Sequence, residues 1–406
     1  MTDSQLLARW YHETVKACDP RDATRVATSR LGLGAPVLLI AVGKAAVPMA
    51  LGACEALRHP PRAGLVVSHT GEPTDVAGLA HIAGDHPVPA HRSAEAAAAL
   101  DALVAAHAGA AEALVLVSGG TTSLIAAPCP PVAVHDMQSA FDILLGSGAP
   151  IDVVNAVRRR LLQWGGGRLA AALRPSRVSC LIVSDVMSGD IASIGSGPCA
   201  ASTSERPVPD TLRAALPERV RAILDAPLPA LHGVRNEVIL DNRTAVTCAV
   251  GLITASGVSI VPTTIPTLEG EASSTGTTIG RALSNSSPGA FVLGGETTVT
   301  LTADAGRGGR CQELALAAAR ELRGQAATLL AAGTDGRDGP TDAAGAIIDG
   351  TSWERMIQAG RDPAADLAAH RAYDALAAID ALIPAWPSGT NVNDLVIGLR
   401  RAAPAA

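Results

Sequence analysis

Short apolar runs alternate with longer helical stretches through most of the chain, and this alternation restricts the fold more than any other feature. The clearest runs are rich in β-branched residues and are bounded by glycine, proline or polar residues. They lie at 36–43, 63–68, 79–84, 113–120 and 177–186. Most of the stretches between them have helical periodicity. Parallel strands need such crossover connections, so the pattern predicts an α/β fold with helices on both faces of a parallel sheet.

These signals divide the chain into two predicted domains. The N-terminal domain is expected over residues 1–235, and it opens with a helix at 4–30. Its last part, 201–235, holds five prolines and few strand signals, which indicates a linker region. Strands and helices alternate again over 236–406, beginning with "NEVILD". There the run "AFVLGGETTVTLTA" (290–303) predicts two strands paired around a Gly-Gly turn.

Composition and charge exclude several classes of function. The chain has 406 residues, a net charge of −6 and a pI near 5.9, so neither nucleic acid nor an anionic membrane surface is an expected partner. No stretch has the roughly 20 apolar residues that cross a bilayer, and the start lacks the apolar core of a signal peptide. The seven cysteines are scattered without zinc spacing. We expect a cytoplasmic protein that acts on a small molecule; a homodimer is left open.

Lysine is almost absent from the chain, which makes the position of Lys44 informative. Of 32 basic residues only Lys16 and Lys44 are lysines, and Lys44 directly follows the run at 36–43. A compact ammonium group at the start of a helix can bind an anion that the helix N-terminus also attracts. A lysine that merely extends from a surface helix is the alternative. The preference for arginine elsewhere favours a functional role.

Glycine and hydroxyl residues follow the apolar part of the run at 113–120. Exposed N–H groups in such a loop can form an anion-binding nest. The loop matches neither a P-loop nor a dinucleotide-binding turn, and an ordinary Gly/Ser/Thr loop explains it equally well. The candidate residues are Ser118, Gly119, Gly120, Thr121, Thr122 and Ser123.

Two carboxylates follow the strand predicted at 177–186. Asp185 lies at its end, and Asp190 lies five residues further along, among serines and glycines. Mg²⁺ takes one or two protein carboxylates and keeps several waters, so the pair suits this ion. Helix-capping or turn-forming aspartates are the alternative. Gly197, in Ser-Gly-Pro, adds a second tight loop that is rich in N–H groups.

The C-terminal half carries further polar, glycine-rich loops. Glu296 lies in the predicted Gly-Gly turn, and Arg310 lies where a helix is predicted to begin, at an end that attracts anions. Asp335 belongs to "GTDGRDGPTDAAGA" and Asn391 to "GTNVNDL". Each loop alone fits an ordinary turn, but several such loops at predicted strand ends favour a ligand site.

The order of these motifs resembles that of the glycerate 2-kinase family with a MOFRL-type C-terminal domain. The matching runs lie between residues 36 and 399 in the family's order and include "VGKAA", "LVSGG", "HPVP", "GGETTVT", "GRGGRCQE", "GTDGRDGPTDAAGA" and "TNVNDL". The resemblance therefore covers nearly the whole chain. It implies a Rossmann-like three-layer domain with a parallel sheet plus a smaller α/β MOFRL-type domain over about 288–400, with an active-site cleft between them.

The resemblance also implies an activity, the ATP- and Mg²⁺-dependent phosphorylation of the 2-hydroxyl of D-glycerate or a related small hydroxy acid. Lys44 is then expected to contact the transferring phosphoryl group or the substrate carboxylate. Asp185 and Asp190 are expected to hold or orient Mg²⁺. Glu296 is a candidate metal ligand or base for the hydroxyl, and Arg310 is expected to pair with a carboxylate or phosphate.

The nucleotide side of this site is assigned in the same way. The loop 118–123 is expected to cradle the phosphates of ATP. Gly197, Asp335 and Asn391 are expected to complete the nucleotide site.

The chain departs from the family pattern at several positions. Thr121 replaces a glycine after "SGG", and Gly189 replaces one of two carboxylates after "SDV". Trp164 stands near a position where the family has basic residues, and Cys311 replaces an asparagine. These departures concern the identity of the hydroxy acid more than the type of reaction.

Two other functions are open from the sequence. The first is an NAD(P)H-dependent hydroxypyruvate reductase, because similar proteins often carry that name. Against it, no predicted strand is followed by a dinucleotide fingerprint with an acidic residue roughly 20 positions later. The second is a catalytically degenerate sensor of a nucleotide or an acid, which the missing carboxylate at Gly189 supports.

Overall fold

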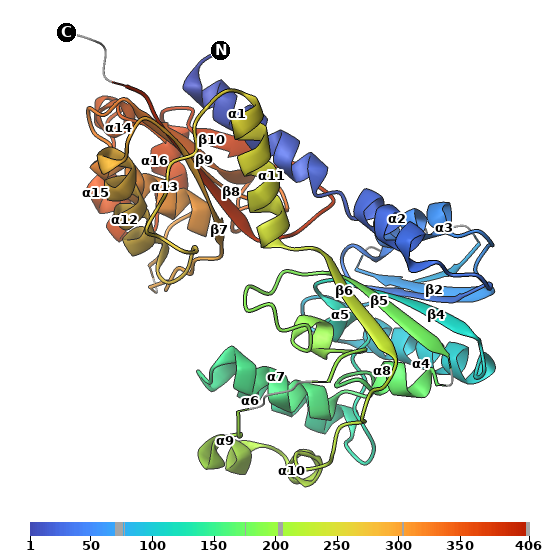
Figure 1. The fold of residues 1–406 in the computed structure, drawn as a ribbon. Helices are drawn as coiled ribbons and strands as arrows, with labels where there is room; N and C mark the ends of the chain where they lie inside the picture. Colours follow the sequence, from blue (N-terminus) through green and yellow to red (C-terminus); the bar gives the residue numbers. More distant parts are fainter. Residues whose placement is uncertain (70–75, 77, 175, 202–205, 303, 403–406) are drawn as a thin grey trace. The chain divides into compact units, whose positions relative to one another are not determined.

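The chain forms two compact units, each with its own sheet and core (Figure 1). The computed structural model describes residues 1–69, 76, 78–174, 176–201, 206–302 and 304–402. Pro20–Ile239 make up the N-terminal unit; Met1–Asp19 together with Leu240–Ala406 make up the C-terminal unit. The α/β class predicted from the sequence is confirmed. No helix in the described ranges is long and apolar enough to cross a membrane.

The N-terminal unit is built on a six-stranded sheet with the order β3-β2-β1-β4-β5-β6. The pairs β1–β2, β1–β4, β2–β3 and β4–β5 are all parallel. From β1 the strand order runs outward in two directions, to β2 and β3 on one side and to β4, β5 and β6 on the other. Ligands bind at such a switch point in sheets of this type. The strands are β1 (Leu38–Val42), β2 (Ala63–Ser68), β3 (Ala80–Ala83), β4 (Glu112–Val117), β5 (Arg177–Val183) and β6 (Val234–Leu240).

Helices cover both faces of this sheet, as a three-layer domain requires. Figure 1 shows α2 and α3 on one face and α4 and α8 on the other. Leu38, Ile40 and Val42, alternate residues of β1, pack with α4 and α8, because side chains alternate between the faces of a strand. The helices are α2 (Pro20–Leu31), α3 (Ala46–Ala56), α4 (His91–Ala106), α5 (Thr121–Leu124), α6 (Val134–Gly146), α7 (Ile151–Leu161), α8 (Arg168–Ala172), α9 (Asp210–Ala215) and α10 (Glu218–Ile223), with a 3₁₀ turn at Ile194–Ser196.

Part of the segment expected to be a linker, 201–235, is folded instead. Residues 202–205 lie outside the described ranges, but α9 and α10 follow them. Pro209 and Pro217 occupy the N-cap positions of these two helices, so the prolines precede helices rather than marking an open chain. The helices are held by burial of four apolar side chains in a core shared with α6 and α7: Leu212, Leu216, Val220 and Leu224.

The C-terminal unit has a five-stranded sheet with the order β10-β9-β8-β11-β7, in which all neighbours are antiparallel. Helices α12 and α13 share a core with one face of the sheet, and α1 and α11 pack together against its strands. The strands are β7 (Gly289–Gly295), β8 (Ala327–Gly333), β9 (Ala343–Asp349), β10 (Leu382–Pro384) and β11 (Asp394–Arg400). The helices are α1 (Asp3–Ala17), α11 (Asn242–Ala255), α12 (Ala272–Asn285), α13 (Arg310–Glu321), α14 (Ser352–Gln358), α15 (Pro363–Ala368) and α16 (Ala372–Ala377).

The unit boundaries differ from the predicted domains at both ends. The single helix expected at 4–30 is two helices, α1 and α2, and the division between units falls between them. Helix α1 therefore belongs to the C-terminal unit, where it contacts α11 and β8. The strand expected to open the C-terminal domain is β6, which instead joins the N-terminal sheet beside β5.

Among residues 290–302, the described part of the predicted strand pair at 290–303, the second strand is not formed. Residues up to Gly295 make one strand, β7, which pairs with β11. A Cβ atom on Gly295 would lie 2.3 Å from the Leu268 carbonyl oxygen, so the backbone there lies directly against a neighbouring segment, with which it forms a parallel bridge. Glu296 then donates its N–H to Leu268 O (2.9 Å), and the following residues run beside that segment instead of turning back on β7.

Candidate functional site

Polar residues follow the carboxyl ends of five adjacent strands in the N-terminal unit. His86 follows β3, His69 follows β2, Lys44 follows β1, the loop 118–123 follows β4, and Asp185 follows β5. Because these strands are parallel, the five ends lie along one edge of the sheet. The sequence predicts candidate residues at three of these ends but not the two histidines, although both follow predicted strands.

Backbone contacts join the turn after β1 to the loop after β4. Lys44 donates its N–H to Gly119 O (2.9 Å), and its side chain is exposed. Gly43 has φ +132°, and a Cβ atom on it would lie 2.1 Å from Ser118 Oγ. This close approach requires glycine. The turn that carries Lys44 and the glycine loop are therefore in direct contact.

The hydroxyl groups of the loop are used to hold the loop itself. Each makes a hydrogen bond within the unit: Ser118 Oγ accepts from Ala45 N–H (3.0 Å), Thr121 Oγ1 donates to Val42 O (2.8 Å), Thr122 Oγ1 bonds with Ser196 Oγ (2.9 Å), and Ser123 Oγ donates to Pro87 O (2.7 Å). The N–H groups of Gly119 and Gly120, in contrast, make no hydrogen bond with any residue that the structure describes. They are the part of the loop that can serve an anion.

Asp185 and Asp190 have different surroundings. A Cβ atom on Gly119 would lie 2.2 Å from Asp185 Oδ2, so the Asp185 carboxylate lies directly against the glycine loop. Asp190 stabilises its own turn, because Oδ1 accepts from Ala192 N–H (3.1 Å) and Oδ2 accepts from the Ser193 hydroxyl (2.7 Å). Asp185 is thus better placed than Asp190 to act together with the loop.

The carboxylates at this edge of the sheet fit Mg²⁺ better than a metal ion whose ligands all come from the protein. Among the described residues no group of three or more His, Cys, Asp or Glu side chains is arranged to hold a metal ion. Mg²⁺ commonly takes one or two protein carboxylates and completes its shell with water and phosphate oxygens. Asp185, beside a loop with N–H groups for an anion, meets that requirement.

Gly197 and Trp164 have structural roles in the N-terminal unit. Gly197 has φ +64° and donates its N–H to Ile194 O (2.9 Å), so that donor is used within the turn. Trp164 is 5% exposed, and its Nε1 donates to Ala97 O (3.4 Å). At this departure from the family pattern the chain therefore has a core residue.

In the C-terminal unit three strand ends meet around a buried carboxylate, Asp394. Asp394 is the first residue of β11, and it lies opposite Gly295 of β7 and Gly333 of β8. Glu296 directly follows Gly295. Asp394 is 2% exposed, so its charge requires a partner.

Arg310 supplies that partner and joins two carboxylates. Its Nε and Nη2 atoms donate to Asp394 Oδ2 (2.6 Å) and Oδ1 (2.9 Å), a bidentate arrangement. Its Nη1 forms an ion pair with Glu296 Oε1, whose other oxygen accepts from Asn393 Nδ2 (3.0 Å). Burial raises the pKa of Asp394, and the hydrogen bonds from Arg310 oppose this rise. The guanidinium stays partly exposed, so it can also contact a ligand.

Asp338 fixes the start of α13 and with it the position of Arg310. Its carboxylate accepts from the N–H groups of Cys311 (3.1 Å) and Gln312 (2.8 Å), two donors that lack partners inside the helix. A Cβ atom on Gly309 would lie 2.3 Å from Asp338 Cγ, so a side chain there would displace the cap. Burial raises the pKa of Asp338 to about 6, although the two N–H groups oppose the rise.

We expect the stability conferred by Asp338 to depend on pH. Its pKa in the folded protein, about 6, lies above its ordinary value of 3.8. Its stabilising contribution is therefore complete below about pH 3.8 and is lost as the pH rises through about 6. Relative to Asp338→Asn, the wild type should lose melting temperature between about pH 4 and pH 7. Scanning fluorimetry over this range tests the expectation, with Asp362→Asn, at the exposed cap of α15, as control. A difference in melting temperature that stays constant with pH would contradict it.

Asp335 and Asn391 lie in the loops beside the Arg310 cluster. Asp335 is exposed, and its Oδ1 accepts from Arg337 N–H (3.0 Å). Asn391 Oδ1 accepts from Asn393 N–H (3.2 Å), and Asn393 in turn contacts the cluster. Cys311 is buried behind the cluster, and burial raises the pKa of its thiol, which makes it unreactive.

Several residues of this cluster are not among those predicted from the sequence. Asp394, Asn393 and Asp338 belong to quoted motifs, so a search for buried carboxylates within those motifs could have found them. Tyr11 of α1 donates its hydroxyl to Gly333 O (2.6 Å) and so holds the end of β8. No sequence signal connects Tyr11 with residues so distant in the chain.

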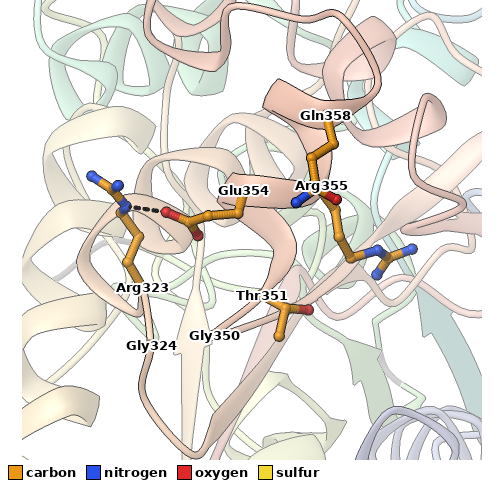
Figure 2. Close-up of a pocket in the computed structure, with 7 residues that line it drawn as sticks. All are labelled: Arg323, Gly324, Gly350, Thr351, Glu354, Arg355 and Gln358. Atoms are coloured by element: carbon orange, nitrogen blue, oxygen red, sulfur yellow. Dashed lines mark hydrogen bonds and ion pairs between the residues drawn. The ribbon is translucent and has the colours of Figure 1, made fainter.

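The pocket in Figure 2 lies at the other end of the C-terminal sheet from this cluster. It is an open hollow of about 670 Å³, lined by Arg323, Gly324, Gly350, Thr351, Glu354, Arg355 and Gln358. Arg323 and Gly324 precede β8 and Gly350 follows β9, whereas Arg310 lies beside the opposite ends of these strands. Arg323 donates to Glu354 (2.7 Å), and Arg355 donates to a backbone carbonyl. None of the predicted site residues lines it.

The fold and the two polar clusters define a class of α/β proteins. In this class a Rossmann-type sheet and a second, antiparallel sheet each carry polar, glycine-rich loops at one edge. Two family models match the chain in this arrangement: "Domain of unknown function (DUF4147)" over residues 6–225 and "MOFRL family" over residues 289–394. With the relatives below, these matches show that the chain belongs to the glycerate 2-kinase family of DUF4147–MOFRL proteins.

Known proteins resemble the chain over nearly its full length. The D-glycerate 2-kinase of Thermotoga maritima is 37% identical over 95% of this chain and 96% of its own. A protein of Agrobacterium vitis that is provisionally named a hydroxypyruvate reductase is 34% identical over 96% of this chain and 93% of its own. The crystal structure of the Thermotoga maritima glycerate kinase has a TM-score of 0.89 and 33% identity, over 98% of this chain and 99% of that one.

Proposed function

We propose that this protein is a glycerate 2-kinase, which transfers the γ-phosphoryl group of ATP to the 2-hydroxyl of D-glycerate in the presence of Mg²⁺. The observation that carries the proposal is the near full-length similarity to the Thermotoga D-glycerate 2-kinase. The polar strand ends support it, because phosphoryl transfer depends on positioning and charge neutralisation more than on covalent chemistry. A cytoplasmic location and a homodimer remain predictions.

In the N-terminal unit we assign the phosphate-binding role to Lys44 and to the loop 118–123. The Lys44 ammonium is a compact charge suited to the transferring phosphoryl group. The N–H groups of Gly119 and Gly120 are the donors that we assign to phosphate oxygens. Asp185 would hold Mg²⁺, which when bound neutralises charge between neighbouring phosphates.

In the C-terminal unit we assign Arg310 to a carboxylate or a phosphate of the substrates. Two of its nitrogens are fixed by Asp394, which sets the plane of the guanidinium. Both oxygens of Glu296 are already engaged, by Arg310 and by Asn393. This arrangement favours an orienting role for Glu296 over metal ligation. Asn391 remains assigned to the nucleotide.

One pair of assays tests the proposal. Purified protein is incubated with D-glycerate, ATP and Mg²⁺ while ADP release is followed, and in parallel with hydroxypyruvate and NADH or NADPH. ADP formation without loss of NADH or NADPH supports the kinase. Consumption of NADH or NADPH would support the reductase that the Agrobacterium name suggests, although the turn after β1, "VGKAAV", lacks the glycine spacing of a dinucleotide site. Inactivity in both assays would favour the sensor.

Two matched substitutions test the assignment of Mg²⁺. Asp185→Asn keeps the shape of the side chain and removes its charge, so we expect about ten-fold more Mg²⁺ to be needed for half-maximal activity. Asp190→Asn should raise this requirement less, because Asp190 stabilises its own turn. Titration of activity with MgCl₂ at saturating ATP measures both. A larger effect at Asp190 would reverse the assignment, and no effect at either position would remove both from the metal site.

A further inference from the structure

His86 lies beside Lys44 at the glycine loop, yet no role has been assigned to it. A Cβ atom placed on Gly120 would lie 3.1 Å from His86 Cδ2, 3.3 Å from His86 Nε2 and 3.3 Å from Lys44 Cγ. The two side chains therefore border the same small space over Gly120. The ring of His69 stands next to that of His86, with 6.3 Å between the ring centroids.

The segment that carries His86 is anchored on both sides of it. On one side, Asp85 Oδ2 accepts from Arg92 N–H (2.9 Å) at the start of α4. On the other side, Pro87 O accepts from the Ser123 hydroxyl (2.7 Å), which belongs to the glycine loop. The backbone of His86 is thus fixed to the same loop that we assign to phosphate, which is the pre-organisation that a binding side chain needs.

The His86 ring is able to bind a ligand. Within the described part of the chain its ring nitrogens make no hydrogen bond, and the side chain is half-buried. Burial and the nearby Lys44 ammonium lower the pKa of His86, and the same causes lower the pKa of His69. A neutral imidazole has one nitrogen that donates and one that accepts.

A hydroxyl group needs an acceptor, and the other groups over Gly120 are donors. The Lys44 ammonium and the loop N–H groups can only donate, and Asp185 lies against the neighbouring Gly119. We propose that His86 accepts the hydrogen bond of the 2-hydroxyl of the hydroxy-acid substrate and thereby positions that hydroxyl beside Lys44. This role rests on the proposed kinase function and assigns its substrate selectivity to one side chain.

The test compares two acids that differ only at that hydroxyl. Calorimetry measures the Kd of D-glycerate and of 3-hydroxypropionate, which lacks the 2-hydroxyl, for the wild type, His86→Leu and His86→Gln. Gln places an amide near the position of Nε2 and can accept a hydrogen bond. His91→Leu is the control, because His91 is a largely exposed histidine of the same unit. The kcat and the KM for D-glycerate and for ATP are measured for all four proteins.

We expect the wild type to bind D-glycerate about ten-fold or more tightly than 3-hydroxypropionate. In His86→Leu this preference should fall to about two-fold or less, while the KM for ATP stays within about two-fold. His86→Gln should recover part of the preference, and His91→Leu should behave as the wild type.

An undiminished preference in His86→Leu would overturn the role of His86, and so would a change confined to the KM for ATP. Both results leave the kinase proposal intact if the wild type releases ADP. A wild type that binds neither acid and releases no ADP would overturn both proposals together. Unchanged melting temperatures confirm that the variants are folded.

Discussion

Lys44→Arg is expected to lower kcat about 100-fold while the melting temperature and the circular dichroism spectrum stay unchanged. Loss of one well-placed charged donor from a transition state typically costs this much. The Lys44 side chain borders the space over Gly120 together with the His86 ring. A planar guanidinium is wider than an ammonium and spreads its charge over three nitrogens, so it cannot occupy the same position against that ring.

The chain supplies a matched control for this substitution in its only other lysine. Lys16 lies in the last turn of α1, and Lys16→Arg should leave kcat and both KM values within about two-fold of the wild type, as exposed substitutions usually do. Steady-state kinetics with D-glycerate and ATP measures both variants. Near-normal turnover of Lys44→Arg would make Lys44 an ordinary surface residue.

Arg310→Met is expected to abolish most activity and to destabilise the C-terminal unit by about 3 kcal/mol. Asp394 is almost fully buried, and Arg310 makes its bidentate pair. Removal of one partner from a buried ion pair leaves an uncompensated charge, which costs about 3–5 kcal/mol. Chemical denaturation followed by circular dichroism measures the loss, and the assay of ADP release measures the activity.

A surface ion pair of the same unit provides the control. Arg307 pairs with Asp342 at 2.8 Å, but both side chains are largely exposed. Arg307→Met should therefore cost less than about 1 kcal/mol. The double variant Arg310→Met/Asp394→Asn should recover part of the lost stability, because it removes the unpaired charge, without recovering activity. Equal losses in the free energy of unfolding for Arg310→Met and Arg307→Met would show that the buried ion pair contributes no more stability than the surface pair.

Four strands of the N-terminal sheet, β1, β2, β4 and β5, could be predicted because nearly all of their residues are buried. Such strands read as continuous apolar runs, and each of the four overlaps a predicted run, as does the less buried β3. The assignment of α1 could not be predicted, since its apolar face shows that it packs but not on which unit. Likewise, β6 looks like any other strand, and only its pairing beside β5 places it in the first sheet.

In the candidate site, too, some features could be predicted from the sequence and others could not. Lys44, Asp185 and Arg310 could be predicted because each has an unusual residue type or position at a strand or helix end. The sequence predicts an anion site at the loop 118–123 from its N–H groups, but it does not show that the four hydroxyls of the loop bond to neighbouring residues. That outcome depends on partners such as Val42 and Pro87, which belong to other strand ends and which no local pattern connects with the loop.

The position of β11 has a consequence for how the protein is made. β11 is the last strand of the chain, yet it lies between β8 and β7 and hydrogen-bonds to both. Until β11 is synthesised, β7 and β8 each have an unpaired edge. Helix α1, which precedes these strands in the chain, lacks the complete sheet against which it packs. This unit can therefore complete its fold only after β11 has been synthesised, and such long-range strand pairing slows folding and exposes intermediates to aggregation. Removal of the last strand would leave both neighbours without their shared partner.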